Sequence, residues 1–186
     1  MTIAIHQPNF FPWLPFFLKM SSVDVFVILN HCQFEKNNYQ NRFFYRDSWR
    51  TMSVNHGLVS ICEKRYANHT SDWQSIKQKL SDKREILDQF DNCIDERLST
   101  CNLNIIKKVS NMLNISTEIV LDEQTNLRSN ERLIWLCKKF GAKQYLAGSG
   151  GVKYMNIEAF NNAGVDVHFQ NVSDVEKIHV LDVIKQ

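Results

Sequence analysis

The first side chains that could do chemistry are His6, Gln7 and Asn9, which follow a short apolar run at residues 3–5. All three prolines of the chain fall within residues 8–15. An apolar strand that ends in polar residues and turns through prolines presents those side chains at the carboxyl edge of a sheet, where open α/β sheets bind ligands. His6 and Asn9 could donate hydrogen bonds to a phosphate or to a developing negative charge. The alternative is structural, with His6 ending a strand and the prolines shaping a loop.

A glycine-rich loop is the second candidate, because it lies between an expected strand and an expected helix; it consists of Gly148, Ser149, Gly150 and Gly151. Backbone N–H groups in such a loop can bind an anion, so we predict that these four residues bind phosphate. The loop lacks the Lys-Ser/Thr pair of a P-loop and the full spacing of a dinucleotide fingerprint. A turn that bends a strand into a helix would explain the same glycines.

The third candidate is the polar stretch at residues 30–42, which follows the second expected strand at the same sheet edge. Amide side chains suit sugar hydroxyls, and Lys or Arg suits phosphate or carboxylate. We therefore predict that this loop supplies four substrate-binding residues in addition to Gln7 and Asn9, namely Gln33, Lys36, Asn41 and Arg42. A solvated loop is the alternative for most of its residues.

Cysteine and metal chemistry are weaker candidates. Cys32 beside His31 could form a thiol nucleophile, but neighbouring residues at a strand end usually point apart. The spacing of His, Cys, Asp and Glu matches no structural zinc site, so no metal is predicted.

Composition limits the class of protein. The 186 residues carry a formal net charge of +2, are 44% hydrophobic and 23% charged, and suit one soluble domain with a sizeable core. The charge is too small to indicate a nucleic-acid partner. No apolar run reaches the ~18 residues of a membrane span, and no signal peptide is evident. Five cysteines without a Cys-x-x-Cys motif favour a reduced, cytoplasmic protein.

The hydrophobic pattern alternates strands and helices. Strands are expected at residues 3–5, 25–29, 43–45, 49–54, 58–62, 117–121, 144–147 and 165–169. Helices are expected at residues 14–20, 129–140, 155–163 and 180–184, and two or three more between 73 and 113. In that last region we predict breaks near 81–82 and 101–102, with Asn102 as a helix N-cap.

This order of elements predicts an α/β fold. It takes the form of one three-layer domain over residues 1–186, with a mostly parallel sheet and a helical insert at about 72–114. The residues do not decide whether the chain forms a homo-oligomer.

Several motifs together resemble the WbqC-like family, and they span nearly the whole chain. They lie at residues 4–13 (Ala-Ile-His-Gln-Pro-Asn-Phe-Phe-Pro-Trp), 22–27, 32–34, 40–42, 132–134, 139–142, 145–148 and 160–169. The chain departs from the family pattern at residues 30–31 and 149–151. The resemblance implies a bacterial protein of O-antigen or surface polysaccharide synthesis. It also implies a role in adding glycine or a similar acyl unit to a nucleotide-linked amino sugar.

A remoter likeness concerns the first strand, its histidine turn and the following helix. This order is similar to the start of the nucleotidyltransferase-like, Rossmann-like α/β fold, which includes ligases that activate a carboxylate with ATP and pass it to an amine. By that analogy His6 would stabilise phosphates and the loop at 148–151 would contact a nucleotide. No residue names a cofactor, and the analogy makes ATP with Mg²⁺ a candidate.

These inferences lead to a functional hypothesis. We expect a transferase or amide-forming ligase whose substrate is a small molecule, a nucleotide-linked sugar, with His6 as the catalytic residue. The alternatives are a non-catalytic sugar-nucleotide-binding or accessory protein of the same pathway, and an acyltransferase that uses Cys32.

Overall fold

The computed structural model describes residues 1–175 and 177–184, and its centre is a five-stranded sheet. The strands lie in the order β5-β2-β1-β6-β7, and every neighbouring pair is parallel. Their bounds are β1 (Thr2–His6), β2 (Val25–Ile28), β5 (Glu118–Leu121), β6 (Gln144–Ala147) and β7 (Asp166–Phe169). The prediction of an α/β fold with a mostly parallel sheet is therefore confirmed.

Continuous apolar runs form the central strands because both faces of the sheet are covered. All four residues of β2 are buried, and so are the three central residues of β1. Alternate side chains enter two separate cores. Ala4 and Phe26 belong to one, and Ile5 and Val27 belong to the other.

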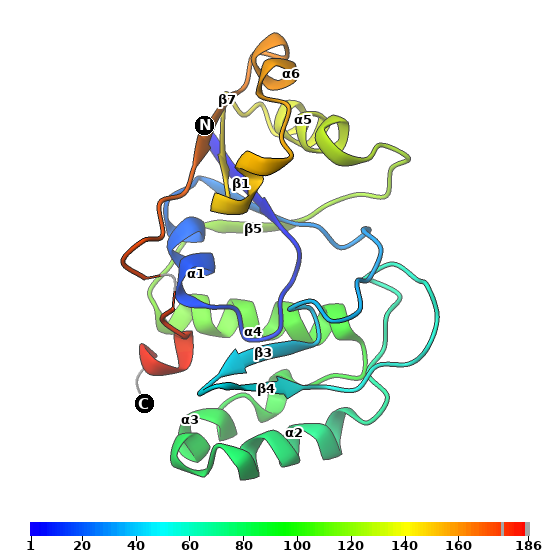
Figure 1. The fold of residues 1–186 in the computed structure, drawn as a ribbon, viewed down its shortest axis with the longest axis vertical. Helices are drawn as coiled ribbons and strands as arrows, with labels where there is room; N and C mark the ends of the chain where they lie inside the picture. The colour runs from blue at the N-terminus through cyan, green and yellow to red at the C-terminus, as the bar shows by residue number, and fades with distance from the viewer. Residues whose placement is uncertain (176, 185–186) are drawn as a thin grey trace.

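Helices on opposite faces of the sheet complete these cores, which gives three layers (Figure 1). The first core contains residues of α1 (Leu14–Ser21) and α4 (Leu98–Met112). The second contains residues of α5 (Ser129–Lys139) and α6 (Ile157–Asn162).

A hairpin and two further helices lie beyond α4, on the side away from the sheet (Figure 1). The hairpin pairs β3 (Arg42–Tyr45) with β4 (Ser48–Thr51), and the helices are α2 (His69–Lys79) and α3 (Arg84–Asp88). The two turn residues Arg46 and Asp47 have φ angles of 50° and 58°. Two consecutive positive φ angles match the right-handed twist of the flanking strands in a two-residue turn.

The C-terminal segment joins the first core. Val180 and Leu181, in a short 3₁₀ turn (Val180–Asp182), are almost fully buried. The Tyr45 hydroxyl donates to Asp182 at 2.6 Å, and the Lys83 ammonium donates to the Leu181 carbonyl at 3.0 Å. This segment therefore ties the hairpin to the helices near it.

The predicted helix break at residues 101–102 is wrong. The helix α4 starts at Leu98 and runs through Asn102, whose side chain is fully buried and caps no helix. Asparagine is poor in helix interiors because its amide competes for nearby backbone groups. Here the amide instead bonds to distant segments, so the helix continues.

Two shorter predictions also need correction. Residues 58–62 form no strand, and only an isolated bridge joins Ser60 to Gln33. The helix expected at 180–184 is the 3₁₀ turn described above. No helix in the described part of the chain is both long and apolar enough to cross a membrane.

Candidate functional site

The candidate site lies where the chain reverses its direction of travel across the sheet. From β1 the chain passes through β2 to β5 on one side, and it then crosses to β6 and β7 on the other. Loops that leave adjacent strand ends in opposite directions open a crevice at this point. The crevice between β1 and β6 holds a pocket of about 450 Å³, called here the Lys19 pocket.

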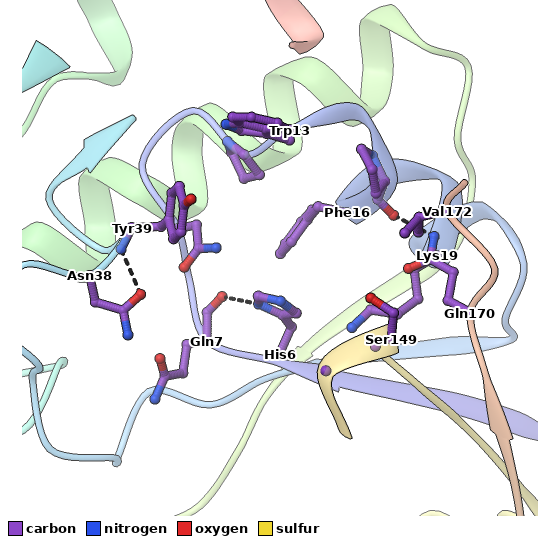
Figure 2. A pocket seen from close by; sticks show the side chains of 15 residues that line it. His6, Gln7, Trp13, Phe16, Lys19, Asn38, Tyr39, Ser149, Gln170 and Val172 are labelled. Atoms are coloured by element: carbon purple, nitrogen blue, oxygen red, sulfur yellow. Dashed lines mark hydrogen bonds between the residues drawn. The ribbon is translucent and has the colours of Figure 1, made fainter. Parts of the chain in front are cut away.

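The Lys19 pocket brings together six of the predicted residues, although they come from distant parts of the sequence (Figure 2). They are His6, Gln7, Asn9, Gly148, Ser149 and Gly150. The other lining residues include Trp13, Phe16, Lys19, Asn38, Tyr39, Gln170 and Val172.

His6 ends β1 and has a defined tautomer. Its Nδ1 lies 2.9 Å from the Gln7 carbonyl oxygen, which can only accept, so Nδ1 carries the proton. Burial, followed by the charge of Lys19, lowers the pKa of His6 to about 3. The ring is therefore neutral near pH 7, and its Nε2 is an acceptor rather than the donor to phosphate that the sequence suggested.

Gln7 is oriented by a fully buried glutamine. The Gln40 Nε2 donates to Gln7 Oε1 at 2.7 Å, and Gln40 Oε1 accepts from the Glu35 amide at 3.0 Å. The Gln7 oxygen is thus occupied, which leaves its NH₂ group as the part available to a ligand.

Asn102 joins the loop after β1 to the loop before β3. Its Nδ2 donates to the Pro8 carbonyl at 2.8 Å and to the Gln40 carbonyl at 2.7 Å, and its Oδ1 accepts from the Tyr66 hydroxyl at 3.0 Å. A buried amide that makes three such bonds holds both loops in one geometry. Sequence reasoning gave Asn102 a capping role and missed this one.

Phe11 also holds the proline turn in place, through aromatic packing. It is fully buried and stacks on Trp73, with ring centroids 5.7 Å apart at 11°. Its φ of 45° is unusual for a bulky residue and costs conformational energy. Aromatic packing holds the turn in this conformation and thereby fixes where Asn9 enters the pocket.

Lys19 is the most unusual residue in the pocket, and sequence reasoning did not select it. It is only 3% exposed, and its ammonium has no hydrogen bond or ion pair within residues 1–175 and 177–184. Burial lowers its pKa to about 7. The available signal was that Lys19 is the single charge in the otherwise apolar stretch that forms α1.

The glycine loop divides into two parts. Gly148, Ser149 and Gly150 line the Lys19 pocket, whereas Gly151 is buried behind it. A Cβ on Gly151 would lie 3.0 Å from Met155 Sδ and 3.2 Å from Phe169 Cε1. The absence of a side chain at Gly151 therefore serves packing, and its predicted contact with phosphate has no support from this geometry.

A second pocket of about 670 Å³, called here the Arg132 pocket, lies beside His6 and Gln7 toward α5. It shares His6, Gln7 and Asn38 with the Lys19 pocket. Its other lining residues include Cys32, Gln33, Glu35, Arg132, Tyr145 and Tyr154. His6 consequently borders both pockets.

Buried Asp122 positions the wall of the Arg132 pocket. Its Oδ1 accepts from the Asn30 amide at 2.7 Å and lies 3.0 Å from His31 Nδ1, while its Oδ2 pairs with Arg132. The Asp122 carboxylate thus holds both the loop after β2 and the Arg132 guanidinium of α5 in position. Cys32 lines this pocket, and burial raises its thiol pKa, which makes it a poorer nucleophile at neutral pH.

Three predicted substrate-binding residues line neither pocket. Lys36 is exposed on the loop surface. Asn41 is buried and donates to the Met52 carbonyl at 2.8 Å. Arg42 lies with its guanidinium carbon 3.9 Å from the centroid of Trp49. Within the described residues, no group of three or more His, Cys, Asp or Glu side chains is arranged to hold a metal ion.

Comparison with known proteins agrees with the resemblance seen in the motifs. The model of the WbqC-like protein family matches residues 7–177. The chain is also 24% identical over 184 residues to the uncharacterized protein Rv1507c of Mycobacterium tuberculosis, covering 89% of this chain and 80% of that protein. No solved structure matches the chain.

Proposed function

Because the chain belongs to the WbqC-like protein family, we propose that it is a transferase or ligase acting on a nucleotide-linked amino sugar. The reaction adds an acyl or aminoacyl unit, such as glycine, to the sugar's amino group during synthesis of bacterial O-antigen or another surface polysaccharide. The supporting observation is that His6 borders two adjoining pockets at the carboxyl edge of the sheet. Two reactants can meet at such a point.

The proposed chemistry uses the acceptor nitrogen of His6. The sugar amine attacks the acyl carbon, a C–N bond forms, and the leaving group departs with the electron pair of the broken bond. The amine must then lose a proton, which the neutral His6 Nε2 accepts. An anion bound beside Lys19 would offset the positive charge that helps to lower the His6 pKa, so substrate binding makes His6 a stronger base.

Two acyl donors fit this scheme. An acyl thioester would release a thiolate, whereas a free carboxylate would first be activated by Mg-ATP. The central position of β1 and the pocket at its carboxyl end support the analogy with nucleotidyltransferase-like ligases, which would use ATP.

The test is a product assay with the purified protein. Nucleotide-linked amino sugars are incubated either with glycine and Mg-ATP or with acyl-coenzyme A, and mass spectrometry follows the sugar nucleotide. We expect a mass increase that corresponds to one amide-linked acyl unit. A product that appears only with ATP would identify the ligase form.

A non-catalytic, sugar-nucleotide-binding protein is the second candidate. The low pKa of His6 in the unliganded protein favours it, because such a weakly basic imidazole is a poor general base. Stoichiometric binding of a sugar nucleotide, without product in any donor combination, would select this function and reject catalysis.

A further inference from the structure

Among residues 1–175 and 177–184, no carboxylate pairs with the ammonium of Lys19. Of the described residues that line its pocket, only His6, Lys19 and Tyr39 are titratable, and none is a carboxylate. Lys19 is 3% exposed and sits on α1, with its ammonium 5.8 Å from the Phe26 ring centroid. A buried charge without a counter-ion is unfavourable, so the fold keeps Lys19 there against a free-energy cost.

The ammonium is directed toward the glycine loop. The Lys19 Nζ lies 3.9 Å from the position of a Cβ on Gly148. Figure 2 shows the side chains of His6, Lys19 and Ser149 around the same end of the pocket. The first hydrogen bond of the loop's 3₁₀ turn runs from the Gly151 amide to the Gly148 carbonyl, so the turn itself does not use the amides of Ser149 and Gly150.

We propose that Lys19 and the loop at Gly148–Gly150 form a subsite for the diphosphate of a nucleotide ligand. The diphosphate supplies the missing negative charge, and the ammonium binds it by charge-assisted hydrogen bonds. This inference deepens the proposed function, on which it rests for the nucleotide-linked substrate. Both a sugar nucleotide and ATP carry the required group.

Proton uptake is a consequence of this arrangement. Burial lowers the pKa of Lys19 to about 7, so the amine is mostly neutral at pH 8. A bound diphosphate favours the charged form and raises this pKa again. His6 is the titratable group that faces Lys19 from β1, whereas Phe26 of β2 and the loop at 148–150 contribute no titratable side chain. Binding at pH 8 should therefore draw nearly one proton onto Lys19.

The experiment is isothermal titration calorimetry at pH 8 with uridine diphosphate and, separately, adenosine diphosphate, without added metal. Buffers of different ionisation enthalpy report the protons taken up. Lys19→Met keeps the side-chain length and removes the charge, and Lys107→Met is the matched control because Lys107 is exposed on α4. We expect Lys19→Met to weaken binding at least tenfold and Lys107→Met to change it less than twofold.

A third variant separates Lys19 from its neighbour. His6→Gln cannot titrate, so it should still take up the proton if Lys19 is the acceptor. Loss of proton uptake in His6→Gln would overturn the proposal, as would unchanged affinity in Lys19→Met or the absence of binding by either diphosphate. A preference for uridine diphosphate indicates a sugar nucleotide, and a preference for adenosine diphosphate indicates ATP.

These results can be told apart from a failure of the proposed function. Lys19-dependent diphosphate binding without an acylated product would retain the subsite and reject the transferase or ligase. Formation of product that Lys19→Met does not slow would retain the enzyme and reject the subsite.

Discussion

In the described part of the chain, one ring nitrogen of His6 makes no hydrogen bond, and the side chain borders two pockets. Because Nδ1 is committed to the Gln7 carbonyl, any proton transfer must use Nε2. His6→Ala should therefore reduce turnover of the acylation reaction by about 100-fold or more, which is the usual contribution of a general base. The measurement is the initial rate of product formation at saturating donor.

A matched histidine provides the control for this experiment. His56 is exposed on a loop and lines neither the Lys19 pocket nor the Arg132 pocket, so His56→Ala should keep the full rate. A His6→Ala enzyme as fast as the His56→Ala enzyme would remove His6 from the mechanism.

Lys19 should lower the stability of the protein in which it sits. Since burial brings its pKa from 10.5 to about 7, the unfolded chain binds more protons between these pH values, and stability rises with pH across that window. Below pH 7 the folded protein bears the full free-energy cost of burying the charged Lys19 ammonium. Lys19→Met should therefore stabilise the protein by about 5 kcal/mol at pH 6, from the difference between 10.5 and about 7 at ~1.4 kcal/mol for each pKa unit.

Denaturant unfolding at pH 6 and pH 9.5 checks this expectation. The stabilising effect of Lys19→Met should shrink at the higher pH, where the wild-type amine is neutral in the folded state. A variant that is less stable than the wild type at pH 6 would show that Lys19 has a structural partner instead.

At the scale of elements, α4 does more than cover the sheet. Its buried Asn102 binds the carbonyls of Pro8 and Gln40 and accepts from Tyr66. Asn102→Ala would leave three buried groups unpaired, at about 1–3 kcal/mol for each, so we expect a loss of about 3 kcal/mol or more in the free energy of unfolding.

Asn111→Ala is the matched control, because Asn111 is exposed on the same helix. Chemical denaturation of both variants, together with diphosphate binding, is the measurement. Equal stability of the two variants would show that the loops keep their geometry without Asn102.

The strands and the main helices were predictable from the sequence because long apolar runs and helical spacing depend on local pattern. The strand at 144–147 was predicted with the observed bounds. The break at 101–102 was predicted wrongly because the partners of Asn102 are 62 and 94 residues away. Local sequence pattern also could not predict the role of Gly151, because that role depends on Phe169, which is distant in the sequence and packs against it.

The candidate site could be predicted in part. Strand-end residues meet at a sheet edge by a general rule, so His6 and the loop at 148–150 could be brought together from sequence. Lys19 could not, because its significance lies in having no hydrogen-bond or ion-pair partner in the described part of the chain, which only the packed structure shows. Arg42 was chosen for its charge, but Trp49 holds its guanidinium outside both pockets.

For the whole molecule, the partly buried His6 and the buried His179 should make stability fall in acid. Burial is the main cause that lowers the pKa of His6 to about 3 and of His179 to about 4; near His179, Asp182 raises the value and Lys83 lowers it. The unfolded chain binds the extra protons as pH falls below 6.5, so stability is lost down to about pH 4 through His179 and to about pH 3 through His6. We expect a loss of about 2 kcal/mol for each histidine at pH 5.

Thermal unfolding from pH 7.5 to pH 4.5 is the measurement, with His179→Gln as the informative variant. Its melting temperature should fall less between those pH values than that of the wild type. An identical acid response in both proteins would show that His179 is not responsible for its share of the loss.

The burial of Val180 and Leu181 in the first core also has a consequence for synthesis in the cell. The backbone amide of Leu14 donates to the carbonyl of Ile178 at 3.1 Å. This hydrogen bond cannot form until Ile178, which is 164 positions later in the chain, has been synthesised. Until that segment leaves the ribosome, the apolar surfaces it covers stay open to other chains and to chaperones. The nascent protein should therefore acquire protease resistance late, after residue 184 has emerged, rather than in stages along the chain.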